Sequence, residues 1–323
     1  MDGRPNLEIV IMSHERSEFL KRALAALEKI DFGEIPKITV SDNPSEPSKR
    51  VSKEIVGGFN YILREGLGAT SHLNQIISEI SSEWVLITHD DDEMLPLMGD
   101  LFKEHSSNPK IGMITGRSLI LNSSGDIVRN NAYESRLRKS KLQTTHSHPK
   151  NNLFWYLFDL GSLFPASAMI IRNEIYKNIQ KINPDVNLAS DYSLSLKIAK
   201  SNTIIFEGVN PVMRYWLHGD NSVYSHEAIS SLRSELTIAK IDEITNSNFN
   251  LSIKRNLTLS KQIFQSIILL NVHHEYEKLA TLNRYINRYK NLKGKLFFGR
   301  TFVIRNRLFS MIVKLEMRRR IRR

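Results

Sequence analysis

Three consecutive aspartates, Asp90, Asp91 and Asp92, follow the apolar run WVLIT at residues 84–88. Like charges this close repel one another, so a chain rarely gathers them unless something neutralises the charge. Asp90 and Asp92, separated by one residue, can hold a hard divalent cation such as Mn²⁺ or Mg²⁺, and such an ion takes phosphate oxygens from a substrate. The alternative is a solvated acidic loop, or an acidic helix start favoured by the helix dipole.

The acids follow the fourth strand of a predicted α/β domain. Apolar runs predict strands at 7–12, 37–42, 59–63 and 84–88. Helices are expected between them, one capped by Ser17 and one within 66–80, where apolar residues recur at helical spacing. This alternation predicts a Rossmann-like, mostly parallel sheet flanked by helices. Ligands bind at the carboxyl ends of strands in such sheets, so Ser13–Arg16, Asp42 and Asp90–Asp92 are expected to meet in one crevice.

The middle of the chain gives more mixed signals. Residues 130–150 are polar and basic and are expected to form a mobile loop, and a turn at 123–126 predicts a hairpin. A short apolar helix is expected at 151–160, and another helix after 187–191. Strands are expected at 111–116, 167–172, 203–207 and 211–217.

Strand signals stop near residue 225, which predicts an α/β domain at 1–225 and a helical region at 226–323. The net charge of +11 comes from the tail, because residues 281–323 hold 14 Lys or Arg and one acid, Glu316. Five apolar residues of the last expected helix share a face flanked by basic residues, a pattern typical of a helix in a membrane interface. They are Ile304, Leu308, Met311, Ile312 and Leu315. The alternative is a helix packed on the α/β domain with a solvated basic end.

The composition disfavours several classes of protein. The absence of cysteine excludes disulfides and thiolate chemistry, and fits a reducing compartment. The first residues, MDGRPNLE, lack the apolar core of a signal peptide, and no apolar run reaches the ~18 residues of a membrane span. P-loop, H-E-x-x-H and G-x-S-x-G motifs do not occur. A basic tail on a nearly neutral body indicates an anionic surface, not nucleic acid, as the partner. A cytoplasmic protein is therefore expected.

Six segments, in order over about residues 6–225, resemble those of family 2 glycosyltransferases. They are LEIVIMSHERSEFLKRAL, ITVSDNPS, GLGATSHLNQII, WVLITHDDDEMLP, LASDYSLSLKIA and MRYWLHGDNS. The resemblance implies the GT-A form of the α/β fold and an inverting enzyme of the bacterial surface-polysaccharide type. The Q-x-x-R-W motif of processive synthases does not occur, so a non-processive enzyme is expected. The chain departs from the family pattern at Met12, His14, Glu15, Leu73 and Ser190.

The resemblance also implies roles for particular residues. Nucleotide contacts are expected from Ser13, Arg16, Asp42, Asp90 and Asp91. Asp42 can accept a hydrogen bond from the imide N–H of uracil or thymine, which favours UDP or dTDP; its alternative role is to cap a turn. Asp92 and His218 are expected to bind Mn²⁺ or Mg²⁺, which would neutralise the departing diphosphate. A hydrogen-bonded structural histidine is the alternative for His218.

Asp191 is the expected catalytic base. Direct displacement needs a carboxylate that takes the proton of the acceptor hydroxyl as it attacks the anomeric carbon. One base without a covalent intermediate fits the inversion of configuration that the resemblance implies. The alternative is a carboxylate that only favours the start of a helix.

Together these expectations describe an inverting glycosyltransferase that moves a sugar from a nucleotide-diphosphate donor to a saccharide acceptor. The acceptor is expected to be lipid-linked, in O-antigen or capsule biosynthesis, at the inner face of the plasma membrane, where the basic tail would bind anionic lipid. Two rival functions stay open. One is a nucleotidyltransferase that forms nucleotide sugars. The other is a non-catalytic basic protein that binds membrane or nucleic acid and whose acids are structural.

Overall fold

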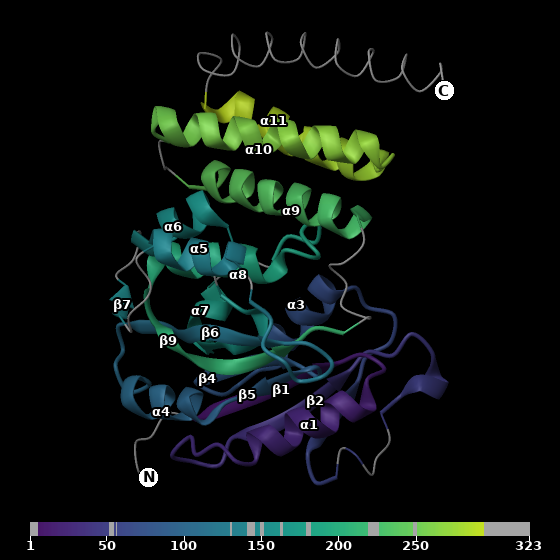
Figure 1. Ribbon diagram of the computed structural model, residues 1–323, viewed down its shortest axis with the longest axis vertical. Coiled ribbons are helices and arrows are strands. Elements are labelled where there is room, and N and C mark those ends of the chain that lie inside the picture. Colours follow the sequence, from purple (N-terminus) through teal and green to yellow (C-terminus); the bar gives the residue numbers. More distant parts are fainter. Residues whose placement is uncertain are drawn as a thin grey trace. The chain divides into compact units, whose positions relative to one another are not determined.

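A computed structural model gives the structure of the chain (Figure 1). It describes residues 6–51, 55, 57–129, 131–140, 146–148, 152–161, 164–178, 182–218, 226–247 and 251–293. The chain divides into two compact units, Met1–Ala228 and Ile229–Arg323. The division falls close to residue 225, where the strand signals of the sequence stop.

One nine-stranded sheet, in the order β3-β2-β1-β4-β8-β6-β9-β5 with β7 paired to β9, forms the frame of the first unit. Its first half is parallel. β1 (Leu7–Ser13) lies between β2 (Lys37–Asp42) and β4 (Trp84–His89), and β3 (Asn60–Leu63) pairs with β2 at the edge. These four strands match the predicted ranges to within one residue, because each is an apolar run that polar residues end.

The second half of the sheet is mixed. Its strands are β5 (Asp92–Met94), β6 (Ile111–Leu121), β7 (His146–His148), β8 (Met169–Arg172) and β9 (Thr203–Trp216). β8 runs antiparallel to β4 and β6, whereas β9 is parallel to β6 and antiparallel to β5 and β7. The two strands predicted at 203–207 and 211–217 are one strand with an irregular register. Glu207 Oε1 accepts hydrogen bonds from the backbone N–H groups of Val209 (2.7 Å) and Asn210 (2.8 Å), which satisfies the donors of that irregularity.

The expectation of a loop over residues 130–150 is wrong for the described part of that segment. It contains helix α5 (Asn131–Ser140) and the short strand β7. Glu134 of α5 forms an ion pair with Arg117 of β6, and Leu137 is buried. β7 pairs with β9 over the whole of its length. These tertiary contacts order a segment whose polar composition alone indicates a loop.

Helices cover both faces of the sheet. In this unit they are α1 (Ser17–Leu27), α3 (Ala69–Glu79), α4 (Pro96–His105), α5, α6 (Asn152–Leu160), α7 (Asn173–Asn178) and α8 (Ser190–Ser201), with 3₁₀ turns at Pro47–Lys49 and Ala166–Ala168. α1 and α4 lie on one face, and α3, α7 and α8 on the other (Figure 1). Ser17 is the first residue of α1 and Arg16 its N-cap, so the predicted serine cap is wrong.

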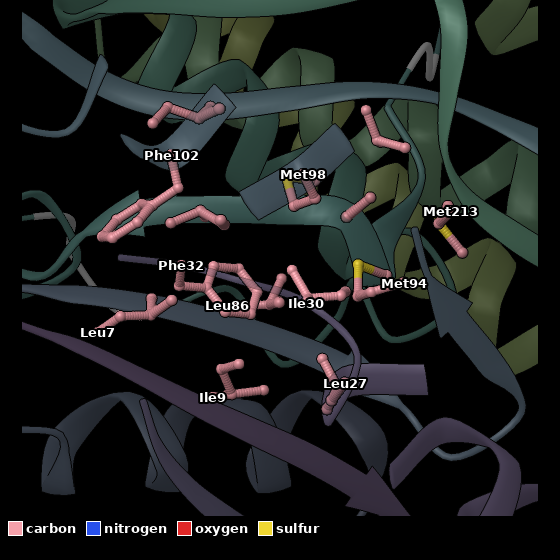
Figure 2. Packing of buried hydrophobic residues seen from close by; sticks show 14 of the residues in the cluster. Leu7, Ile9, Leu27, Ile30, Phe32, Leu86, Met94, Met98, Phe102 and Met213 are labelled. Carbon is pink, nitrogen blue, oxygen red and sulfur yellow. The ribbon is translucent and has the colours of Figure 1, made fainter. Parts of the chain in front are cut away.

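The main apolar core lies between the sheet and the α1–α4 face. Leu86 of β4 lies near Ile30 and Phe32 (Figure 2), and Ile9 of β1 and Met98 and Phe102 of α4 belong to the same buried cluster. Burial of each such side chain contributes about 1.5–3 kcal/mol relative to its exposure. The rings of Phe102 and Trp84 meet edge to face, with centroids 6.0 Å apart. This packing fixes β1 and β4 and therefore the positions of the polar residues at their carboxyl ends.

The second unit is helical. Its described helices are α9 (His226–Thr245), α10 (Ile253–Val272) and α11 (Tyr276–Lys293), and the unit begins at Ile229 within α9. The side chain of Lys240 on α9 donates to Gln262 of α10 at 3.0 Å, and Tyr289 of α11 donates to Asn256 at 2.8 Å. None of the described helices is long and apolar enough to cross a membrane. The amphipathic helix predicted in the basic tail lies outside the described residues.

Candidate active site

Strands β1, β2 and β4 end together at one edge of the sheet. Ser13 and Asp42 are paired in register, and the backbone N–H of Asn43 donates to the carbonyl of Ser13 at 3.0 Å. On the other side of β1, the backbone N–H of Asp90 donates to the carbonyl of Met12 at 3.1 Å. The structure therefore brings Ser13, Asp42 and Asp90 to one edge, where ligands bind in α/β proteins.

Arg16 faces two of the three aspartates. Its Nη2 lies 2.7 Å from Oδ1 of Asp90, and its Nη1 donates to Oδ2 of Asp91. The backbone N–H of His14 donates to the other oxygen of Asp90 at 2.8 Å. Burial raises the pKa of Asp90, and the charge of Arg16 opposes that rise. Arg16 thus supplies part of the positive charge that the acidic run requires.

Glu15 stabilises the turn between β1 and α1, which also contains Arg16. Its φ of +62° lies in the left-handed region, which is uncommon for a residue with a side chain. Its carboxylate accepts a hydrogen bond from the backbone N–H of Ser45 at 2.7 Å and pairs with Lys49 at 3.2 Å. The hydrogen bonds with Ser45 and then the contact with Lys49 lower the pKa of Glu15 to about 2. This departure from the family pattern therefore ties the β1–α1 turn to the segment after β2.

Asp91 joins the acidic run to the end of β9. Its Oδ2 lies 2.9 Å from Nε2 of His218, two residues past the end of that strand. The imidazole packs on the ring of Phe19 from α1, with centroids 4.6 Å apart. Burial opposes ionisation of Asp91, but the charges of His89 and Arg16 and the contact with His218 lower its pKa overall. Asp91 is therefore the aspartate that contacts both Arg16 and His218, two of the predicted site residues.

Asp92 points instead to Ser167, in the 3₁₀ turn before β8. The hydroxyl of Ser167 donates to Oδ2 of Asp92, and the backbone N–H of His89 donates to that hydroxyl at 3.2 Å. Nδ1 of His89 lies 2.9 Å from the hydroxyl oxygen of Ser167. Because a hydroxyl has one proton and an ionised carboxylate has none, Nδ1 of His89 must be the donor to Ser167. Nδ1 of His89 therefore carries a hydrogen, and when the imidazole is neutral its Nε2 has a lone pair for a ligand.

Three of these residues can hold a metal ion. Ligand atoms of His89, Asp91 and Asp92 all lie within 4.8 Å of one another. The second oxygen of Asp92 is buried and has no hydrogen-bond partner in the part of the chain that the structure describes. Burial raises the pKa of Asp92; it opposes ionisation of His89 too, but the contact with Asp92 raises the pKa of that histidine overall. Asp92 and His218 are the metal ligands predicted from the sequence, whereas His89, the last residue of β4, was not predicted.

Asp42 has one carboxylate oxygen that accepts hydrogen bonds and one, called here its bare oxygen, that accepts none from the described residues. Oδ2 accepts hydrogen bonds from the backbone N–H of Val51 at 2.9 Å and from the hydroxyl of Tyr61 at 2.7 Å. Oδ1 is buried and has no hydrogen-bond partner among the described residues. A buried carboxylate oxygen without a partner is costly, so it indicates a ligand that donates a hydrogen bond there. The contact with Tyr61 was not predicted from the sequence.

Asp191 lies in the first turn of α8, where the sequence predicted a helix start. Burial raises its pKa, and the backbone N–H of Tyr192 and the charge of His89 lower it. A carboxylate whose proton affinity is raised by burial is suited to act as a general base.

Trp216 and Trp155 have rings that could stack on a sugar, but both have partners within the chain. The guanidinium of Arg22 lies 4.5 Å from the centroid of the Trp216 ring. Trp155 packs edge to face on Phe154, with centroids 4.9 Å apart. His146 and His148 both belong to β7, which pairs with β9.

Comparisons with known proteins bear on the family and the fold. The family model of glycosyl transferase family 2 matches residues 8–173, which is more than half of the chain. No curated protein matches the chain. Among solved structures, a mannosyltransferase from Pyrobaculum calidifontis in complex with GDP-Man and Mn²⁺ has a TM-score of 0.51 at 13% identity. That match covers 89% of this chain and 86% of the other.

A second solved structure, residues 1–349 of TarS from S. aureus in complex with UDP, has a TM-score of 0.49 at 15% identity, and the match covers 92% of this chain and 78% of that one. Likeness at such low identity concerns the fold alone. The family match is of another kind, because it covers the strands that deliver Ser13, Asp42 and Asp90. The chain belongs to glycosyl transferase family 2 and is a glycosyltransferase of the GT-A fold.

Proposed function

We propose that this glycosyltransferase moves a sugar from a UDP- or dTDP-linked donor to a saccharide acceptor, with inversion at the anomeric carbon. The observation that carries the proposal is the meeting of three strand ends at one edge of the sheet. They place the bare oxygen of Asp42, the guanidinium of Arg16 and the cluster of His89, Asp91 and Asp92 beside one another.

The donor nucleotide would be held from the ends of β1 and β2. Oδ1 of Asp42 accepts the imide N–H of uracil or thymine, a donor that adenine and cytosine lack. Arg16 and Ser13 lie at the end of β1, and a guanidinium is well suited to bind the oxygens of a diphosphate. Asp90, which forms an ion pair with Arg16, would accept from the ribose hydroxyls. The family match covers all four residues.

The acidic cluster fits a divalent cation. Carboxylate and imidazole are ligands that suit Mn²⁺, and the bare oxygen of Asp92 lacks the partner that a cation would supply. Asp92, Asp91 and His89 would hold the ion, and His218 adjoins them through Asp91. Bound there, the cation would stabilise the negative charge that develops on the departing diphosphate. The guanidinium of Arg16 would stabilise the same negative charge.

The transfer itself would be a single displacement. The hydroxyl oxygen of the acceptor forms a bond to the anomeric carbon while the bond from that carbon to the diphosphate breaks. The electron pair of the broken bond leaves with the diphosphate, and Asp191 takes the hydroxyl proton. Burial raises the pKa of Asp191, which strengthens it as a base. Attack from the face opposite the leaving group inverts the configuration.

A thermal-shift series with UDP, dTDP, GDP and CDP, each with and without Mn²⁺, tests the donor site. A ligand bound only by the folded state raises the apparent stability of the protein. We expect stabilisation by UDP or dTDP that increases with Mn²⁺. NMR of the product formed from the matching nucleotide sugar and a saccharide acceptor then gives the anomeric configuration. No stabilisation by any of the four nucleotides, or retention of configuration, would overturn the proposal.

The acceptor is proposed to be a lipid-linked saccharide of O-antigen or capsule biosynthesis, presented at the inner face of the plasma membrane. The charge of residues 281–323 supports this part, since 14 Lys or Arg accompany a single acid. Each basic residue near an anionic leaflet contributes about 1 kcal/mol of binding. Deletion of residues 300–323 is expected to move the protein from the membrane fraction to the soluble fraction. An unchanged distribution would argue against a membrane-bound acceptor.

A further inference from the structure

We infer that Tyr61 is a positioning residue that sets the base preference of the donor site, because it fixes which oxygen of Asp42 a nucleotide base can reach. The inference rests on the proposed function, since it concerns the base of the donor. Tyr61 does not belong to any of the six segments that resemble the family, and no chemistry was expected of it.

The geometry around Asp42 leaves a single acceptor. Asp42 is fully buried at the end of β2, and Tyr61 comes from the neighbouring edge strand β3, where it pairs with Val40. The hydroxyl of Tyr61 (2.7 Å) and the backbone N–H of Val51 (2.9 Å) both donate to Oδ2, so both lone pairs of that oxygen are occupied. Oδ1 is left without a hydrogen-bond partner among the described residues. The carboxylate therefore presents one acceptor in one orientation.

Such an acceptor selects bases by the ring nitrogen that they present. In uracil and thymine that nitrogen carries a hydrogen between two carbonyl groups, so it can donate to Oδ1. In cytosine the corresponding nitrogen has a lone pair, which a carboxylate repels. A buried polar group left unpaired costs far more than a hydrogen bond gains, so the discrimination should be larger than one hydrogen bond suggests.

The role of Tyr61 is to prevent rotation of the carboxylate. The terminal torsion of aspartate is broad and soft, so a carboxylate held by one donor exchanges its oxygens readily. Burial, and then the hydrogen bond to Asp42, raise the pKa of the Tyr61 hydroxyl, which keeps it protonated as a donor. The Tyr61 side chain is 37% exposed, so its replacement by phenylalanine removes the hydroxyl without opening the core.

The experiment compares the wild-type full chain with Tyr61→Phe and Asp42→Asn by titration calorimetry with UDP and with CDP, in excess Mn²⁺. Tyr276→Phe is the matched control, because its hydroxyl contacts His274 in the second unit. The wild type and the control should prefer UDP. In Tyr61→Phe the affinity for UDP should fall about 2- to 12-fold, the range of one net hydrogen bond, while the affinity for CDP stays level or rises. Asp42→Asn should lose most of the preference.

Each outcome decides one point. Tyr61→Phe with the wild-type ratio of UDP to CDP affinity would overturn the inference and leave the proposed function intact. An equal loss of affinity for both nucleotides would show a merely structural role and would overturn it as well. A wild-type protein that binds neither of these nucleotides, nor dTDP, would overturn the proposed function itself. Circular dichroism of each variant confirms that the compared proteins are folded.

Discussion

Nε2 of His218 lies 2.9 Å from Oδ2 of Asp91, although 127 residues separate the two in the sequence. The same oxygen of Asp91 accepts a hydrogen bond from Arg16. One carboxylate oxygen thus links the turn before α1, the acidic run after β4 and the end of β9. The link makes Asp91 the meeting point of three segments, and it gives His218 a role that can be tested by substitution.

The first prediction concerns His218. His218→Ala removes the imidazole that holds Asp91, so the affinity for Mn²⁺ in the presence of UDP should fall about 10- to 100-fold, the usual effect of removing a group that orients a metal ligand. Free Mn²⁺ measured by electron paramagnetic resonance reports this affinity without any assay of turnover. His105→Ala is the control, because His105 lies on α4 and contacts Glu104. Equal Mn²⁺ affinities of the wild type and His218→Ala would contradict the prediction.

Ser167 provides the second prediction. Ser167→Ala leaves Oδ2 of Asp92 without its hydroxyl partner. It also removes the oxygen to which Nδ1 of His89 donates, so that the proton is no longer fixed on Nδ1. Mn²⁺ should therefore bind about tenfold more weakly. The same resonance titration measures the effect. Ser234→Ala is the matched control, because Ser234 is also a buried serine, hydrogen-bonded to the carbonyl of Ser231 in the second unit. If both variants lose thermal stability but neither loses affinity for Mn²⁺, Ser167 is structural only.

The parallel half of the sheet was predictable because its signals are local. Each of its strands is an apolar run that ends in polar residues, and the carboxyl ends of parallel strands must lie at one edge. Ser13, Asp42 and Asp90 could therefore be predicted to lie together without any knowledge of side-chain contacts. The positions at which β1, β2 and β4 end are sufficient for this prediction.

The contacts between side chains were not predictable in the same way. Ser167 reaches Asp92 across 75 residues because β8 runs antiparallel beside β4, and no motif marks it. Tyr61 reaches Asp42 because β3 pairs with β2 in one register, which a sequence does not specify at an exposed edge. Which of three consecutive aspartates faces which partner depends on these neighbours. The sequence therefore indicated the acidic cluster but not the division of contacts within it.

The third prediction concerns Asp191. Asp191→Asn removes the proposed base, so the rate of sugar transfer should fall about 10²- to 10⁴-fold, while UDP binds as in the wild type. Rates at saturating donor and calorimetry with UDP separate the two effects. Asp100→Asn, an exposed carboxylate on α4, serves as control. A variant that keeps more than a tenth of the wild-type rate would remove Asp191 from the mechanism.

The pH profile of the wild type adds to this prediction. A base must be ionised to act, and burial raises the pKa of Asp191 above its ordinary value. The rate should therefore rise with pH over a range above that of an ordinary aspartate. Burial of the charged form also costs stability at neutral pH, and a neutral amide at this position would not incur that cost. Asp191→Asn should consequently melt at a higher temperature than the wild type at pH 7, with the difference shrinking in acid.

The last prediction concerns His72, which is buried on α3 with Nε2 2.7 Å from the hydroxyl of Ser41. Burial, and then the charge of Arg64, lower the pKa of His72 from 6.5 to about 4. Between these two values the unfolded chain binds a proton that the folded protein does not, so stability is full above pH 6.5 and falls as the pH decreases. From the slope of ~1.4 kcal/mol per pH unit, the loss due to His72 reaches about 2 kcal/mol at about pH 5.

His72→Gln keeps a side chain that can bond to Ser41 but does not titrate. Urea unfolding of the wild type and the variant at about pH 7.5 and about pH 5 gives the difference in the free energy of unfolding at each pH. The wild type should lose about 2 kcal/mol more than His72→Gln between the two values. His105→Gln, which changes a histidine on α4, should follow the wild type. Parallel losses in the wild type and His72→Gln would mean that His72 is protonated in the folded protein, and the acid sensitivity would then lie with other groups.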